Sequence, residues 1–137
     1  MKFLYLDTSA ILKRYFDEAE SEESEVILSN FQIFAISNIA ITEALINIRR
    51  KLTGQERELA TRLFEADLPS FTVVDFSSEL GHQAVTVSDG KNLATLDSIH
   101  IATALRFKSQ GITFLTYDRT QGLAAKRSGL KTLGAVS

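Results

Sequence analysis

The chain begins with a short run of bulky apolar residues, Phe3–Leu6, that ends at an acidic residue, Asp7. A run of this length without polar alternation is typical of a strand buried on both faces, as in the centre of a parallel sheet. Ligands of such open sheets bind at the carboxyl ends of the strands, so Asp7 is a candidate site residue. Capping of the helix that follows, to which Thr8 and Ser9 are also suited, is the alternative interpretation of Asp7.

The rest of the chain alternates between strands and helices. Strands are predicted at residues 33–36, 71–76 and 112–117, with a short fifth strand at 130–133, and helices at 10–16, 38–52, 55–66, 78–87, 95–107 and 118–128. The acidic stretch 17–25 is predicted to be a solvated loop and helix start, and a turn is predicted at 88–91. Strands separated by helices of this length indicate an α/β domain whose parallel sheet is covered on both faces.

The composition limits the kind of site that this domain carries. The length of 137 residues is that of one domain. The chain has no cysteine and only two histidines, which disfavours a zinc site and leaves a hard cation bound by oxygen atoms. The net charge of −2 gives no footprint of a dedicated nucleic-acid binder, although a cation bound among acids would invert the local charge. No apolar run is long enough to cross a membrane and Asp7 interrupts any signal-peptide pattern, so we expect a cytoplasmic protein with no membrane partner.

Three further acidic residues lie in settings as unusual as that of Asp7. Glu43 and Asp97 lie in helices that are apolar around most of their circumference, where a charge is costly unless it is paired or bound to a metal. Asp118 follows a strand and opens a helix, as Asp7 does. Each has a structural alternative: a narrow polar stripe for Glu43, and helix caps for Asp97 and Asp118.

Taken together, the four acids predict a metal site. Two of them leave the carboxyl ends of strands and two lie early in neighbouring helices, so all four are expected to converge on one crevice. Clustered carboxylates repel one another unless they are protonated or bridged by cations. Oxygen donors without histidine or cysteine favour Mg²⁺ or Mn²⁺, and such a site meets the requirements of phosphodiester hydrolysis. His100, which follows Asp97 by one turn, is interpreted as a hydrogen-bonded structural residue outside the site.

The order and spacing of four motifs resemble those of the PIN-domain family, and in length the chain resembles the VapC-like toxin ribonucleases of type II toxin–antitoxin systems. The motifs lie at residues 6–9, 37–43, 96–104 and 115–118, and the resemblance covers essentially the whole chain. It implies a single PIN domain over residues 1–137 with strand order 3-2-1-4-5, which places the first and fourth strands side by side at the topological switch point. It further implies an acidic metal-binding quartet of Asp7, Glu43, Asp97 and Asp118, with Thr8, Ser9 and Thr116 near the site.

The resemblance also implies a function. The protein would be a Mg²⁺- or Mn²⁺-dependent endoribonuclease, the toxin partner of a small antitoxin protein, and a homodimer formed through helices. The apolar residues considered for the dimer are Ile46, Ile48, Leu52, Leu59 and Leu63, and the basic residues considered for RNA are Lys13, Arg14, Arg49, Arg50 and Lys51.

Other functions are compatible with parts of the pattern. The main alternative is a non-catalytic PIN fold that binds RNA or a protein. A haloacid-dehalogenase-like phosphatase also starts with a strand and an acid, but it would need a second acid where Ser9 stands. A phosphoacceptor receiver domain would need an acid pair after the first strand, and that pair is not evident.

Overall fold

The structure is a computed structural model that describes residues 1–90 and 92–137. Its described residues form a sheet of five parallel strands in the order β3-β2-β1-β4-β5. The strands are β1 (Phe3–Leu6), β2 (Ile33–Ser37), β3 (Thr72–Val74), β4 (Thr113–Thr116) and β5 (Lys131–Gly134). The predicted parallel sheet and its strand order are therefore confirmed.

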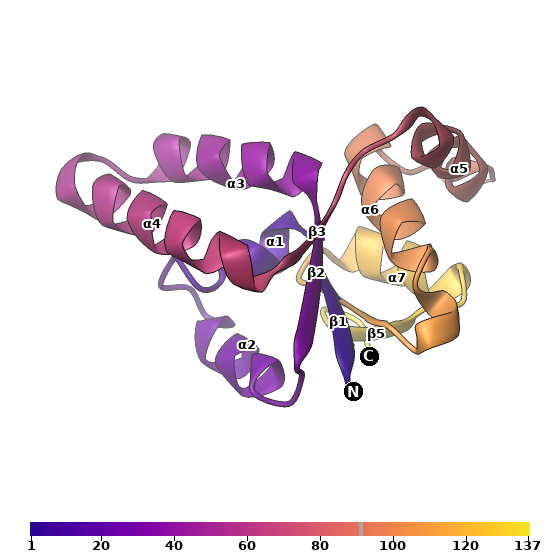
Figure 1. Ribbon diagram of the computed structural model, residues 1–137, viewed down its shortest axis with the longest axis horizontal. Coiled ribbons are helices and arrows are strands. Elements are labelled where there is room, and N and C mark those ends of the chain that lie inside the picture. The colour runs from indigo at the N-terminus through magenta and orange to yellow at the C-terminus, as the bar shows by residue number, and fades with distance from the viewer. Residues whose placement is uncertain (91) are drawn as a thin grey trace.

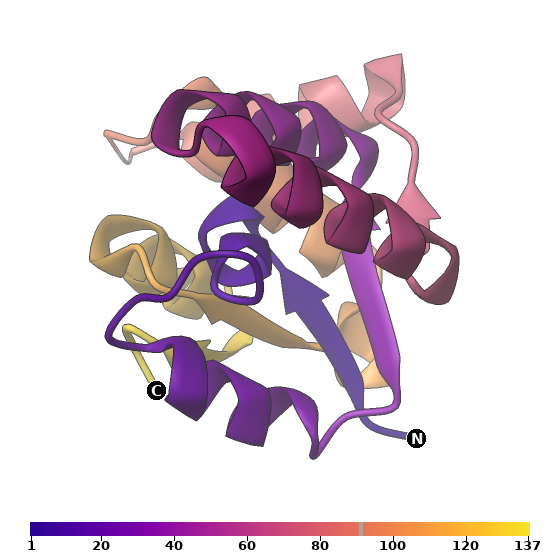
Figure 2. The same cartoon turned by 90° about the vertical axis from the view of Figure 1, so that its left-hand side faces the viewer.

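Helices cover both faces of this sheet, which Figure 1 shows nearly edge-on. One face carries α1 (Thr8–Leu12), α2 (Ser21–Leu28), α3 (Asn38–Lys51) and α4 (Gly54–Asp67), and the other carries α5 (Ser78–Ser88), α6 (Thr95–Leu105) and α7 (Arg119–Arg127). Figure 2 looks onto the first of these layers, with α3 and α4 above α2. Short 3₁₀ turns occur at Leu68–Ser70 and Lys108–Gln110.

Strand β1 is buried along its whole length, which explains why its sequence shows no polar alternation. Phe3 and Tyr5 face the hydrophobic core under α5, α6 and α7, whereas Leu4 and Leu6 face the core under α1, α3 and α4. β1 pairs with β2 on one side and with β4 on the other, so the strand order reverses between β1 and β4. The carboxyl ends of these two strands are where this topology places a crevice.

Several boundaries differ from the predicted ones. The first helix, predicted at 10–16, is α1, because the Asp7 side chain accepts the backbone N–H of Ala10 and starts the helix earlier. The third strand, predicted at 71–76, is limited to β3 at the edge of the sheet. The predicted turn at 88–91 contains Gly90 with φ +71°, and Lys91 lies outside the described residues.

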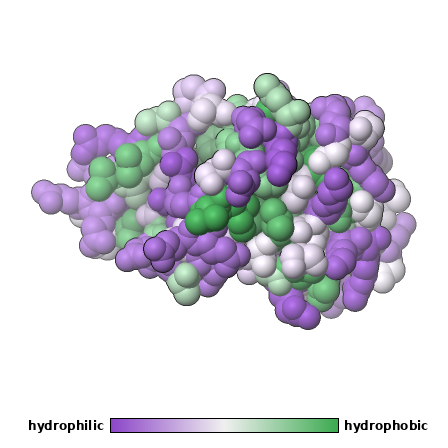
Figure 3. Space-filling model, turned by 90° about the horizontal axis from the view of Figure 1, so that it is seen from below, coloured by the Kyte–Doolittle hydropathy of each residue, from purple (hydrophilic) through white to green (hydrophobic). Residues whose placement is uncertain are grey.

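Fewer of the apolar residues considered for a dimer are exposed than the sequence predicts. Ile48 is fully buried in the core under α3, so its prediction as a dimer contact is wrong. Ile46, Leu59 and Leu63 are exposed on α3 and α4. Figure 3 shows the side of the molecule at the amino ends of the strands, where a small hydrophobic area is surrounded by hydrophilic residues. Within the described ranges no helix has the length and apolar character needed to cross a membrane.

Candidate active site

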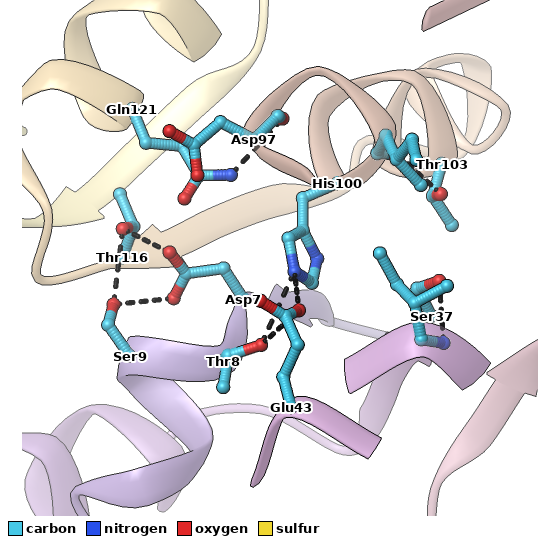
Figure 4. A network of polar contacts seen from close by, with 12 residues as sticks. Asp7, Thr8, Ser9, Ser37, Glu43, Asp97, His100, Thr103, Thr116 and Gln121 are labelled. Atoms are coloured by element: carbon cyan, nitrogen blue, oxygen red, sulfur yellow. Dashed lines mark hydrogen bonds and ion pairs between the residues drawn. The ribbon is translucent and has the colours of Figure 1, made fainter. Parts of the chain in front are cut away.

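A pocket with a volume of about 340 Å³ lies where the chain leaves β1 and β4. The four acids that the sequence singles out, Asp7, Glu43, Asp97 and Asp118, all line this pocket. Two follow the carboxyl ends of β1 and β4, and two lie in the first half of α3 and α6. Figure 4 shows the Asp7 carboxylate turned toward Ser9 and Thr116 and the Glu43 carboxylate turned toward His100 and Thr8. The predicted convergence of the four residues on one crevice is therefore present in the structure.

Asp7 is held by three hydrogen bonds and is only 2% exposed. Its Oδ1 atom accepts the hydroxyl of Ser9 at 2.7 Å and the backbone N–H of Ala10 at 2.9 Å. Its Oδ2 atom accepts the hydroxyl of Thr116 at 2.5 Å (Figure 4). Asp7 therefore caps α1, as the alternative interpretation proposes, and its carboxylate is also fixed in orientation at the pocket wall.

The two hydroxyls tie the end of β4 to the end of β1. Ser9 Oγ accepts the backbone N–H of Tyr117 at 2.9 Å, and Thr116 Oγ1 accepts that of Asp118 at 3.0 Å. Each hydroxyl has one proton and gives it to Asp7, so the 3.3 Å contact between the two hydroxyl oxygens adds no further bond. Ser9 and Thr116 thus position Asp7 and the chain that leads to Asp118.

Glu43 is fixed by a second network that crosses from α3 to α6. Its Oε1 atom accepts the hydroxyl of Thr8 at 2.7 Å and the Nε2–H of His100 at 2.9 Å. An ionised carboxylate only accepts hydrogen bonds, so Nε2 carries a proton, and in the neutral ring Nδ1 is then an acceptor. The hydroxyl of Tyr5, 2.6 Å from Nδ1, then donates to it. Tyr5 and His100 are both almost fully buried, so this arrangement is shielded from water.

His100 is therefore part of the site, although the sequence interpretation leaves it out. The histidine is hydrogen-bonded and buried, as that interpretation expects, but its partner is one of the four acids, and it lines the pocket. The sequence contains one indication that His100 has a polar partner. Tyr5 lies in a strand predicted to be fully buried, and a buried tyrosine hydroxyl usually finds a polar partner.

Asp97 and Asp118 lie at the amino-terminal ends of α6 and α7. Ala94 is the N-cap of α6, and Asp97 is the third residue of this helix. The alternative interpretation of Asp97 as a helix cap is therefore wrong. Asp118 does cap α7, since its Oδ1 atom accepts the backbone N–H of Gln121 at 3.0 Å. The side-chain amide of Gln121 donates to the backbone carbonyl of Asp97 at 3.3 Å and thereby links the two helices (Figure 4).

The electrostatics differ among the acids. Burial raises the pKa of Asp7, and the positive charge that His100 carries when its ring is protonated, together with the three hydrogen bonds, only partly offsets it. Burial also opposes ionisation of Glu43, but the hydrogen bonds from His100 and Thr8 outweigh it and lower the pKa of this carboxyl. The pKa of Asp97 is raised by burial and then by the charges of Asp118, Asp7 and Glu43, with His100 acting in the opposite direction. Mutual repulsion of the acids is thus a property of the site.

The donor set fits a hard divalent cation that keeps much of its water. The four carboxylates offer only oxygen ligands, as Mg²⁺ and Mn²⁺ prefer. In the described part of the chain, no three acidic or histidine side chains stand close enough to hold one ion together. Mg²⁺ in proteins is ordinarily bound by one or two carboxylates and several waters, not by a cage made of protein ligands alone. The spacing of the four carboxylates is compatible with this kind of binding.

The topology and the pocket define an α/β domain with an acidic crevice at its switch point. Residues 4–126 match the PIN domain family. The chain therefore belongs to the PIN domain family.

Solved structures share this fold. The chain is similar to FitAcB from Neisseria gonorrhoeae, with 21% identity, a TM-score of 0.74, and coverage of 96% of this chain and 97% of that one. It is similar to VapC20 of Mycobacterium tuberculosis, described as a sarcin–ricin loop cleaving toxin, with 15% identity, a TM-score of 0.69, and coverage of 93% and 95%. The chain is also similar to VapBC2 from Rickettsia felis, solved with a DNA fragment of its promoter. The sequence identity is 15%, the TM-score is 0.68, and the match covers 96% of this chain and 98% of that one. None of the curated proteins matches the sequence.

Proposed function

We propose that this protein is a Mg²⁺- or Mn²⁺-dependent endoribonuclease and the toxin of a type II toxin–antitoxin pair. The observation that carries the proposal is the meeting of Asp7, Glu43, Asp97 and Asp118 in one pocket. Membership of the PIN family and the likeness to VapC20, itself described as an RNA-cleaving toxin, support the same class of reaction. The likeness to VapBC2 supports an antitoxin partner.

Each acid has a distinct task in this proposal. Asp7 and Glu43 are the oriented ligands, because hydrogen bonds from the surrounding side chains fix both carboxylates. Asp97 and Asp118 would contact the ion through its bound water, because no three of these side chains stand close enough to hold one ion directly. A divalent ion bound there would supply an activated water and neutralise charge on the phosphate oxygens.

No side-chain nucleophile is required. The role of the surrounding side chains is to orient the carboxylates that would hold the ion, and for Glu43 the same hydrogen bonds also favour the ionised form. His100 positions Glu43 through the 2.9 Å hydrogen bond and is not proposed to move a proton.

The assembly is part of the proposal. A homodimer would use the exposed apolar residues Ile46, Leu59 and Leu63 on α3 and α4. Analytical sedimentation of the pure protein tests it, and a monomer at every concentration would count against the dimer.

The activity is tested by cleavage of one structured RNA with wild type and with Asp7→Asn, in Mg²⁺ and in EDTA. We expect cleavage only by wild type with the ion, and a loss of orders of magnitude in Asp7→Asn with little change in RNA affinity, because the loss falls on transition-state stabilisation. The midpoint of the thermal melt should rise on addition of Mn²⁺, since the ion binds the folded state.

The variant His100→Ala separates this reaction from metal-independent acid–base cleavage. It should reduce activity without abolishing it. Activity that survives EDTA, or that disappears with His100→Ala but not with Asp7→Asn, would refute the proposed reaction. Metal binding and RNA binding without cleavage would favour the non-catalytic alternative.

A further inference from the structure

Two lysines stand at one side of the acidic pocket and are unused by the proposed reaction. Lys13, just after α1, and Lys51, at the end of α3, both line the pocket together with the four acids. Their ammonium groups lie over aromatic rings, that of Lys13 at 5.3 Å from the ring centre of Tyr117 and that of Lys51 at 5.1 Å from that of Phe16. Such cation–π contacts hold an ammonium group in place without neutralising its charge.

One carboxylate lies between the two lysines. Glu18 Oε1 is 3.0 Å from Lys13 Nζ, and Glu18 Oε2 is 3.9 Å from Lys51 Nζ. Glu20 adds a second carboxylate oxygen, 2.7 Å from Lys13 Nζ. Two oxygens of one anion are therefore shared between two ammonium groups, as two oxygens of a phosphodiester would be.

The side chains of Glu18 and Glu20 are partly exposed to solvent, whereas the Lys13 side chain is largely buried. The Lys13 side chain is 9% exposed, but Glu18 and Glu20 are 35% and 41% exposed. Burial lowers the pKa of Lys13, yet its hydrogen bonds to Glu20 and Glu18 outweigh that effect and raise it, so this lysine stays charged. Because Lys13 is buried and charged, loss of its carboxylate partners without replacement would be costly, so we expect them to leave only as another anion takes their place.

The loop that carries Glu18 and Glu20 is held without the lysines. The hydroxyl of Ser21 accepts the backbone N–H of Glu18 at 3.0 Å and donates to the backbone carbonyl of Phe16 at 2.8 Å. These two bonds fix the turn into α2. Displacement of the glutamate side chains from the lysines would leave these two hydrogen bonds intact.

We propose that Lys13 and Lys51 form a subsite for a backbone phosphate of single-stranded RNA, and that Glu18 occupies this subsite in the free protein as an internal competitor. The inference rests on the proposed function, because it assigns to the same pocket the phosphate next to the one that is cleaved. The RNA would displace Glu18 toward solvent and gain both lysines as it enters.

Binding is measured by fluorescence anisotropy with a short fluorescein-labelled oligouridylate, in Mg²⁺, with all variants in an Asp7→Asn background so that the probe stays intact. Lys13→Gln should weaken binding about five-fold near 0.1 M salt and reduce the salt slope by about 0.7, the value for one lost contact to a single strand. Lys51→Gln should act in the same direction. Glu18→Gln should bind more tightly than its parent, because the carboxylate that contacts both lysines is removed and only Glu20, which contacts Lys13 alone, remains.

Lys2→Gln is the matched control, since the Lys2 ammonium also lies over an aromatic ring, 5.9 Å from that of Phe31, but before β1 at the opposite edge of the sheet. It should bind as the parent does. Lys13→Arg should retain binding, and thermal melts identify any variant that fails to fold.

The inference is overturned if Glu18→Gln fails to tighten binding, if Lys13→Gln and Lys2→Gln lose affinity equally, or if no variant binds the probe. Because the readout is binding, it is independent of cleavage. An inactive wild type whose affinity depends on Lys13 and Glu18 would refute the nuclease and leave the subsite standing.

Discussion

Removing the hydroxyl of Tyr5 tests whether the buried chain from Tyr5 through His100 to Glu43 orients the site. Tyr5→Phe keeps the ring, which stacks on Phe114 with 5.2 Å between ring centres, and deletes the hydroxyl that donates to His100 Nδ1. Burial and the charge of Asp7 raise the pKa of Tyr5 well above its ordinary value, so the wild-type hydroxyl is protonated and able to donate.

The expected loss of stability follows from the burial of both partners. A buried acceptor left without its donor costs about 1–3 kcal/mol. For 137 residues the entropy of unfolding is about 0.3 kcal/mol/K, so the melting temperature should fall by about 3–10 °C. The affinity for Mn²⁺ should fall by up to about 10-fold, less than for loss of the orienting partner itself, because His100 stays but is held less firmly.

Calorimetric melts and Mn²⁺ titration measure the two effects separately. Tyr15→Phe is the matched control, because the Tyr15 hydroxyl donates to Asp67 at 2.5 Å and Tyr15 lines a different pocket. It should lower the melting temperature and leave Mn²⁺ affinity unchanged. A Tyr5→Phe protein that binds Mn²⁺ as tightly as wild type would refute the view that Tyr5 and His100 orient Glu43.

Substitutions at three further positions test the site and its surroundings. Asp97→Asn should raise the melting temperature of the metal-free protein and abolish the rise that Mn²⁺ gives, because it removes a charge that burial and neighbouring acids disfavour; outright unfolding would contradict this. The folded state holds the Asp97 proton above the usual pKa of 3.8, so metal-free wild type should lose stability as the pH rises from 3.8 through the raised pKa, and melts should show a smaller loss in the variant. Thr116→Val should lower the free energy of unfolding in urea by about 1–3 kcal/mol, since buried Asp7 loses a donor, and Thr116→Ser should restore it; equal stability of the two would count against that bond. Gly134→Ala should lower the melting temperature, because Gly134 has φ +92° and an added Cβ would collide with the carbonyl oxygen of Thr116; an unchanged melt would contradict that geometry.

The order of the elements was predictable because burial leaves a direct trace in the sequence. The unbroken apolar run of β1 reflects helices on both faces, and the alternation of strands with helices reflects parallel connections. The ends of elements were less predictable, since they depend on single contacts. Asp7 moves the start of α1 by accepting from Ala10, and β3 is short at an edge where it pairs on one side only.

The acids of the site were predictable for a related reason, and their partners were not. A carboxylate in an apolar helix, such as Glu43, stands out because burying a charge is costly. The groups that make this burial tolerable come from distant segments, as His100 does, and neither spacing nor composition specifies such a pairing. Gln121 was missed because its side chain joins α7 to α6 through a backbone atom of Asp97, a contact that only the folded chain creates.

The hydrogen bond between Glu43 and His100 has a consequence for how the domain opens. The sheet lies between two hydrophobic cores, one packed under α3 and the other under α6, and this bond joins the two helices around its carboxyl edge. We expect this single hydrogen bond to couple the two layers only weakly, so that without a ligand each layer opens locally while the other stays closed and native-state hydrogen exchange separates their amides into two groups. A ligand that contacts both helices would merge those groups, so that the slowest amides of α3 and α6 exchange together. Occupancy of the pocket thus sets whether the domain opens by halves or as one unit.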